Sequence, residues 1–71
     1  MEPVELQRRI VERLLAHHPA MRTLEQLSVE LGGADVEATV EELVSDGLAT
    51  RLGELVGASW VAVRLDRLRT I

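Results

Sequence analysis

Residues 40–53 have the sequence V-E-E-L-V-S-D-G-L-A-T-R-L-G, in which the spacing of the apolar residues changes at Gly47. Over residues 36–44 valine and leucine recur every three or four positions, which is typical of the buried face of a helix. Over residues 48–52 apolar and polar residues alternate, which is typical of a half-buried strand. The sequence therefore predicts a helix that ends at a glycine and is followed at once by a strand.

A pair of glycines, Gly32-Gly33, separates this helix from the one before it. We expect the later helix over 35–46, with Asp35 as its N-cap. We expect the earlier helix over 23–31, because T-L-E-Q at its start fits a capping box. Two glycines favour the left-handed backbone found at helix ends, so the chain should turn sharply between these helices.

A further helix is predicted at the start of the chain, over 3–18. Leu6, Ile10 and Leu14 recur there at four-residue spacing and form one apolar stripe. Pro19 disfavours helical backbone in the residue before it and should end the helix.

A second β-prone run is predicted over 60–65, where alternate residues are apolar. A glycine-containing connection over 53–59 joins it to the run at 48–52, and the simplest arrangement is an antiparallel hairpin packed on the helices. The tail, 66–71, has a second interpretation, since its apolar residues also suit a short helical turn. The predicted fold is α+β, mainly α, with three helices and a C-terminal two-stranded hairpin in a single domain over 1–71.

The composition excludes several classes of function. The chain has 71 residues, no cysteine, eight arginines without lysine, and twelve carboxylates, which give a formal net charge of −4. So short a chain removes only about 60% of its unfolded surface from water, which leaves little room for both a core and a deep catalytic cleft. Without cysteine there is no disulfide and no thiolate zinc site. We expect a protein that is not an enzyme and uses no cofactor or small-molecule substrate.

No segment of the sequence suggests a membrane. The longest apolar run, Trp60 to Val63, is far shorter than the ~20 residues that span a bilayer. The N-terminal sequence lacks the apolar segment of a signal peptide. We expect a cytoplasmic protein without membrane contact.

The segments T-L-E-Q-L-S-V-E-L-G-G (23–33) and V-E-E-L-V-S-D-G-L-A-T-R-L-G (40–53) resemble the winged helix-turn-helix family. In that family a leucine followed by an acidic-glycine-leucine ending marks the end of the recognition helix and the start of the wing. The matching residues here are Leu43, Asp46, Gly47 and Leu48. The resemblance implies a module of the transcription-regulator type, whose third helix lies in the DNA major groove and whose wing contacts the flanking backbone.

The distribution of charge disfavours DNA binding through the third helix. Residues 1–33 carry a net charge of −1, residues 34–50 carry −5 with no arginine, and residues 51–71 carry +2. Because the apolar stripe of the third helix must face inward, its glutamates should lie on the surface that would approach the bases. DNA binding depends on neutralising phosphates with arginine or lysine, and this helix has neither.

Eight residues are candidates for contact with DNA or with an acidic partner. Those expected nearest phosphate are Arg22, Arg51, Arg64 and Arg67, and those expected nearest the bases are Ala34, Glu37, Ala38 and Glu41. The alternative is that the arginines pair with the acidic third helix or with neighbouring carboxylates.

Three apolar residues of the predicted hairpin are candidates for self-association: Leu55, Val56 and Trp60. Leu55 and Val56 lie in the predicted connection, where little core is available to bury them, so they could contact a second copy. Trp60 could anchor a partner. The alternative for Trp60 is that it covers the core against the first helix, with its indole N–H donating to a carbonyl.

His17 and His18 are not expected to bind a metal ion. Adjacent residues of a helix point about 100° apart, and the chain has no cysteine and no further histidine. Glu41 and Glu42 lie on an exposed helical face, without the burial that general acid catalysis uses. We expect no catalytic residues and no metal ligands.

Two functions fit these observations. The first is a small winged-helix regulatory module that works as a homodimer or with a protein partner, with DNA contact disfavoured by the acidic third helix. The second is a winged helix devoted to protein–protein interaction, with no role in nucleic-acid binding. Both use the same fold, so the fold alone does not distinguish them.

Overall fold

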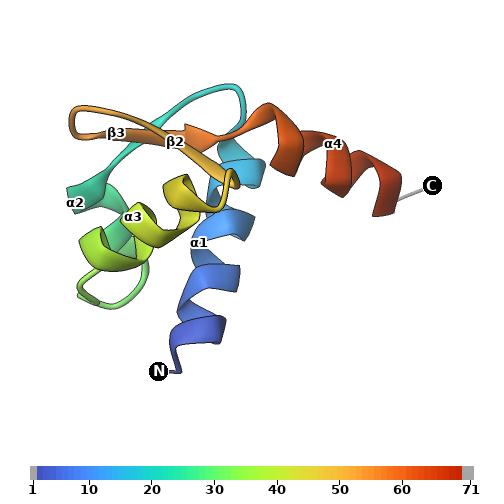
Figure 1. Cartoon of the computed structure of the whole chain (residues 1–71). Coiled ribbons are helices and arrows are strands. Elements are labelled where there is room, and N and C mark those ends of the chain that lie inside the picture. Colours follow the sequence, from blue (N-terminus) through green and yellow to red (C-terminus); the bar gives the residue numbers. More distant parts are fainter. Residues whose placement is uncertain (1, 70–71) are drawn as a thin grey trace.

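The computed structural model describes residues 2–69, which form four helices and three short strands (Figure 1). The helices are α1 (Pro3–His17), α2 (Leu24–Glu30), α3 (Glu37–Ser45) and α4 (Trp60–Arg69). The strands are β1 (Arg22–Thr23), β2 (Ala49–Leu52) and β3 (Leu55–Ala58). The predicted α+β class with mainly helical structure is confirmed.

The strands form one antiparallel sheet in the order β1-β3-β2. In the central strand, Val56 lies opposite Arg22 of β1 and opposite Arg51 of β2. Only Gly53 and Glu54 connect β2 to β3. Gly53 has a φ of 64°, a left-handed conformation that glycine adopts without steric penalty, so β2 and β3 form a hairpin with a two-residue turn.

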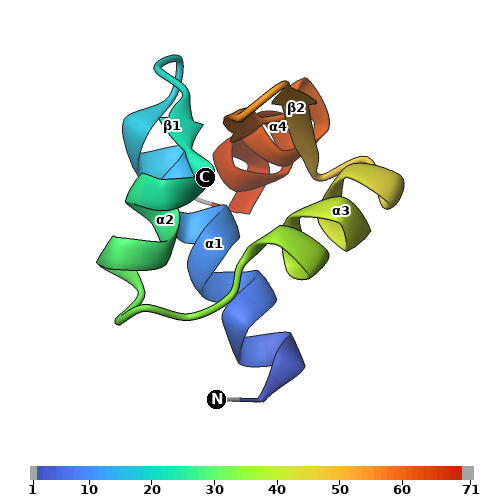
Figure 2. The same cartoon turned by 90° about the vertical axis from the view of Figure 1, so that its left-hand side faces the viewer.

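The core lies between the first three helices and the sheet. Figure 2 shows α2 and α3 on either side of α1. The largest fully buried side chains are Ile10, Leu14, Leu27, Val40, Leu43 and Val56. Each aliphatic side chain buried in this way stabilises the fold by about 1.5–3 kcal/mol relative to exposure, so the core is aliphatic and needs no aromatic residue.

Two of the predicted helix ends are confirmed in detail. The hydroxyl of Thr23 accepts a hydrogen bond from the backbone N–H of Gln26 at 3.0 Å, and the Gln26 side chain accepts one from the Thr23 backbone at 2.9 Å, which completes the capping box of α2. After α3, Gly47 has a φ of 79°, and the backbone N–H of Leu48 donates to the Leu43 carbonyl at 2.9 Å. This left-handed glycine turns the chain from α3 into β2, as predicted.

The predicted second strand over 60–65 is wrong. These residues lie in α4, and the partner of β2 is β3, inside the segment predicted as a loop. The hydroxyl of Ser59 accepts from the backbone N–H of Ala62 at 3.1 Å and therefore caps the start of α4. The helical interpretation of the tail is correct as far as Arg69, and Ile71 lies outside the described residues. The described chain has four helices where three were predicted.

Smaller differences concern the ends of elements. The helices predicted over 3–18, 23–31 and 35–46 extend one or two residues beyond α1, α2 and α3, and the strand predicted over 48–52 starts one residue before β2.

The predicted N-cap of α3 is also wrong. Val36 occupies that position, and the Asp35 carboxylate accepts from the Glu37 backbone N–H at 3.3 Å. Strand β1 was not predicted, because two residues are too few to show a periodic pattern.

Candidate functional site

The exposed side of α3 is acidic. Val40 and Leu43 are buried on its inner side, while Glu37, Glu41 and Glu42 are exposed, as predicted. We call these three glutamates the acidic face. Any partner that approached α3 from outside would meet carboxylates first.

Arg51 binds the acidic face from β2. Its Nη2 lies 3.1 Å from a carboxylate oxygen of Glu37, and its Nη1 pairs with Glu41. Its Nε donates to the carbonyl of Gly53 at 2.7 Å, so all three nitrogens of the guanidinium have partners. For this arginine, the alternative of pairing with the acidic third helix is confirmed, because the β2 strand that follows Gly47 places it beside α3.

Arg22 is also paired. Its guanidinium contacts the Glu30 carboxylate of α2, and both side chains are partly buried. Nε2 of His17 lies 4.0 Å from the same carboxylate. Arg22 is therefore held between β1 and α2.

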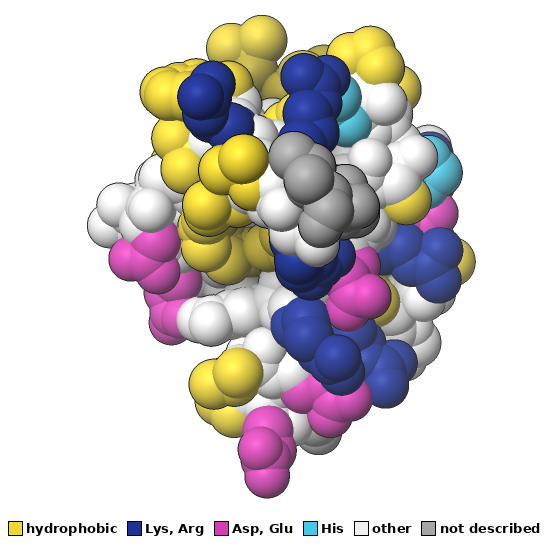
Figure 3. Space-filling view, turned by 90° about the vertical axis from the view of Figure 1, so that its right-hand side faces the viewer, with side chains coloured by type: hydrophobic (Ala, Val, Ile, Leu, Met, Phe, Trp, Pro, Cys, Tyr) yellow, Lys and Arg dark blue, Asp and Glu magenta, His cyan; other side chains and the backbone are white. Residues whose placement is uncertain are grey.

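The remaining predicted phosphate contacts, Arg64 and Arg67, lie on α4 and are exposed. The four arginines thus come from three different elements, and two of them are held in ion pairs within the fold. Figure 3 shows dark-blue arginine side chains gathered in the lower half of this side of the molecule, with magenta carboxylates beside them. Of the two alanines expected near the bases, Ala38 is exposed, whereas Ala34 is half-buried.

The residues predicted for self-association differ in how far they are exposed to solvent. Val56 is 0% exposed, so its prediction as a surface residue is wrong: it lies in the central strand and not in a loop. Leu55, at the turn end of β3, is exposed. Trp60 is 72% exposed at the first position of α4, so the alternative that it covers the core is also wrong.

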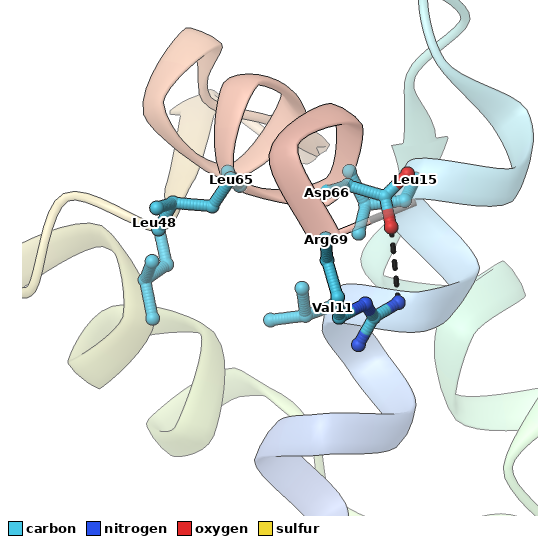
Figure 4. A pocket seen from close by; sticks show the side chains of 7 residues that line it. Val11, Leu15, Leu48, Leu65, Asp66 and Arg69 are labelled. Carbon is cyan, nitrogen blue, oxygen red and sulfur yellow. Dashed lines mark hydrogen bonds and ion pairs between the residues drawn. The ribbon is translucent and has the colours of Figure 1, made fainter. Parts of the chain in front are cut away.

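A groove between α1 and α4 was not predicted. It has a volume of about 150 Å³ and is apolar except at one edge (Figure 4). We call it the α1–α4 groove; its lining residues are Val11, Leu15, Leu48, Ala62, Leu65, Asp66 and Arg69. Asp66 and Arg69 pair with each other at 3.0 Å at the edge. Figure 3 shows hydrophobic side chains in the hollow beside α4 on this side of the molecule.

A second hollow continues from the α1–α4 groove along α1. It shares Val11, Leu15, Leu48 and Arg69 with the groove and extends to Val4 and Gln7. The two hollows together run from the first turn of α1 to α4, and the charged residues Arg8 and Glu12 also line the second one. The sequence signal for it was the helical alternative for the tail, which gives α4 an apolar side.

Within residues 2–69 no group of three or more histidines, cysteines, aspartates or glutamates is arranged to hold a metal ion. No helix in the same range is long and apolar enough to cross a membrane. Comparison of the chain with protein-family models, with curated proteins and with solved structures finds no match.

Proposed function

We propose that this chain is a winged helix-turn-helix module that works through protein contacts and does not use α3 to bind DNA. The element order supports the winged-helix assignment: α2 and α3 are joined by a short glycine-containing turn, and a two-residue hairpin follows α3. In a winged helix α3 would be the recognition helix and β2-β3 the wing.

The observation that carries the proposal is the position of Arg51. A wing contacts DNA phosphate with free cationic side chains, but this wing arginine binds Glu37 and Glu41 of the helix that would lie in the groove. Duplex DNA carries about one negative charge per 1.7 Å of axis, and affinity comes largely from counterions released by arginine and lysine. The α3 surface would bring carboxylates to the phosphates and release few counterions.

The apolar surface supports protein contacts as the alternative. Three large apolar residues of α4 are exposed, Val61, Leu65 and Leu68, and so is Val4 in the hollow that continues the groove along α1. A contiguous exposed apolar surface on a small domain is typical of a site for another protein.

The proposal can be tested with a labelled random-sequence DNA duplex and fluorescence anisotropy. At about 20 mM salt, where electrostatic attraction is strong, we expect no binding by the natural chain up to about 100 µM, the weak end of non-specific DNA affinities. The variant with Glu37→Gln and Glu41→Gln frees Arg51 and removes two carboxylates from α3. It should bind the duplex, and its affinity should fall as salt rises.

The matched control is the variant with Glu5→Gln and Glu12→Gln. It makes the same change in net charge on α1 and frees Arg8 and Arg9 from their pairs with these carboxylates. We expect it to bind DNA more weakly than the α3 variant. Tight, salt-dependent binding by the natural chain would refute the proposal in favour of DNA recognition, and equal binding by both variants would remove the support for α3 as a recognition helix.

A further inference from the structure

Helix α4 is incompletely covered by its own chain. It has ten residues, of which only Ala62 is buried, and it contacts α1 and β3. Figure 1 shows it extending away from the other helices and the sheet. Isolated helices shorter than about 12 residues are marginal in water and depend on packing of an apolar face. Packing against a surface outside its own chain would therefore stabilise α4.

The unused side of α4 is apolar. Val61, Leu65 and Leu68 recur at i, i+4 and i+7, which places them in one row along the helix. We call this row the α4 stripe; all three residues are exposed. Leu65 lies at the border between the stripe and the α1–α4 groove and reaches toward Leu48 in Figure 4. The stripe and the groove therefore belong to one continuous surface.

Opposite charges flank this surface. Arg64 lies three residues after Val61 and four before Leu68, beside the stripe, and it forms no ion pair within residues 2–69. On the other side Glu42 accepts a hydrogen bond from Gln7 at 2.8 Å, and Gln7 lines the hollow that continues the groove. Glu42 likewise forms no ion pair in that range.

We infer that the occupant of the α1–α4 groove is a second copy of this chain, whose α4 stripe packs into the groove across a two-fold axis. In such an isologous dimer each copy supplies one groove and one stripe, and both already lie on the same side of the molecule. The same symmetry brings the positive side of one copy, at Arg64, toward the negative side of the other, at Glu42. This inference rests on the proposed function, because it names the protein that the module contacts.

The size of the chain allows such an interface. The accessible surface is 4771 Å². A standard interface takes about 800 Å² from each partner, which is about one sixth of this surface. One side of the molecule, comprising α4, the groove and the first turns of α1, is therefore a sufficient contact.

The molar mass in solution tests the inference. By light scattering after size exclusion at about 100 µM, where a micromolar dissociation constant gives mostly dimer, we expect twice the monomer mass of 7.9 kDa. The variant with Leu65→Asp and Leu68→Asp places charge in the centre of the interface and should weaken the dimer at least about 30-fold, the effect of removing a central apolar anchor. Its far-UV circular dichroism should show a folded protein.

The matched control is the variant with Val29→Asp and Leu52→Asp. These side chains are 71% and 70% exposed, more than the 54% of Leu65 and the 57% of Leu68, but they lie on α2 and β2, away from the groove. This variant should keep the dimer mass. Arg64→Glu should weaken the dimer about threefold, the size of a rim ion pair, and adding Glu42→Arg to the same chain should restore it.

Three results would overturn the inference: a natural chain that is monomeric at about 100 µM, a dimer dissociation constant, measured by dilution, that the Leu65 and Leu68 changes leave unaltered, or an equal rise of that constant in the Val29 and Leu52 control. A monomeric chain would exclude a second copy as the occupant and leave the proposed function to a different protein. None of these results involves DNA, so the duplex titration fails or succeeds separately: DNA binding refutes the proposed function, whereas a monomer refutes only the choice of partner.

Discussion

Replacing Val56 by alanine tests the position of the central strand. Val56 is 0% exposed, and it lies between β1 and β2 in the sheet. The change removes two buried methyl groups, worth about 1.6 kcal/mol in transfer free energy. The cavity left behind should raise the loss of unfolding free energy to about 2–3 kcal/mol. For 71 residues the total unfolding free energy should be about 4–10 kcal/mol, so the loss is a large fraction of it.

Urea unfolding followed by circular dichroism measures this loss, with every variant at one protein concentration because a dimer is stabilised by mass action. With an m-value of about 1 kcal/mol/M, the midpoint should fall by about 2 M. Leu55→Ala is the control: it removes more atoms, but from a side chain that is 40% exposed next to Val56, and should lower the unfolding free energy by about 1–1.5 kcal/mol, less than Val56→Ala. If Leu55→Ala destabilises the protein as much as Val56→Ala, residues 55–58 are not a central strand.

Two further predictions concern the start of α4. Ser59→Ala should lower the unfolding free energy by about 1 kcal/mol, because it removes the cap on the Ala62 N–H and the 2.6 Å hydrogen bond to the Gly47 carbonyl; urea unfolding checks it, and an unchanged midpoint would contradict this role. Trp60, the one tryptophan of the chain and 72% exposed, should be quenched by acrylamide almost as efficiently as free tryptophan; strong protection in a chain shown to be monomeric would mean that Trp60 is buried.

The helical part of the fold was predictable because its signals are local. The capping box at Thr23 and the left-handed glycine at Gly47 each depend on residues within five positions of one another. The apolar spacing of α1 and α3 then identifies the buried side of each helix, and Ile10, Leu14, Val40 and Leu43 are indeed in the core.

The second half of the hairpin was not predictable from the same kind of signal. Val61, Val63 and Leu65 alternate as a strand would, but Val61 and Leu65 are also four residues apart, which suits a helix. Gly57 weakens the strand pattern of residues 55–58, and it lies close to Met21: a Cβ at this position would be 3.2 Å from Cγ of Met21, which would have to shift by a few tenths of an ångström. This contact is between residues far apart in the sequence, so the sequence alone predicts a loop where β3 lies.

The pairing of Arg51 was foreseen only as an alternative, for a related reason. Glu41 and Glu37 lie ten and fourteen residues before Arg51 in the sequence. Whether the arginine meets them depends on which side of β2 it occupies and on how β2 leaves Gly47. Ala49 and Arg51 are two residues apart and so lie on the same side of β2, the side on which Ala49 is buried, and only the packed structure shows that Arg51 reaches α3 from there.

The ion pairs of Arg51 affect the charge that the hairpin presents to a partner more than they affect the unfolding free energy. Exposed ion pairs contribute about 0–1 kcal/mol, and Glu37 and Glu41 are largely exposed, so the pairs add little to the unfolding free energy. They do, however, hold the one arginine of the hairpin, and the carboxylates that hold it still leave residues 34–51 with a net charge of −4. Arg64, which has no such pair within residues 2–69, lies instead beside the exposed apolar stripe of α4. Because an available cation and an exposed apolar stripe coincide on α4 and not on α3, we propose that the binding surface lies on the side of α1 and α4.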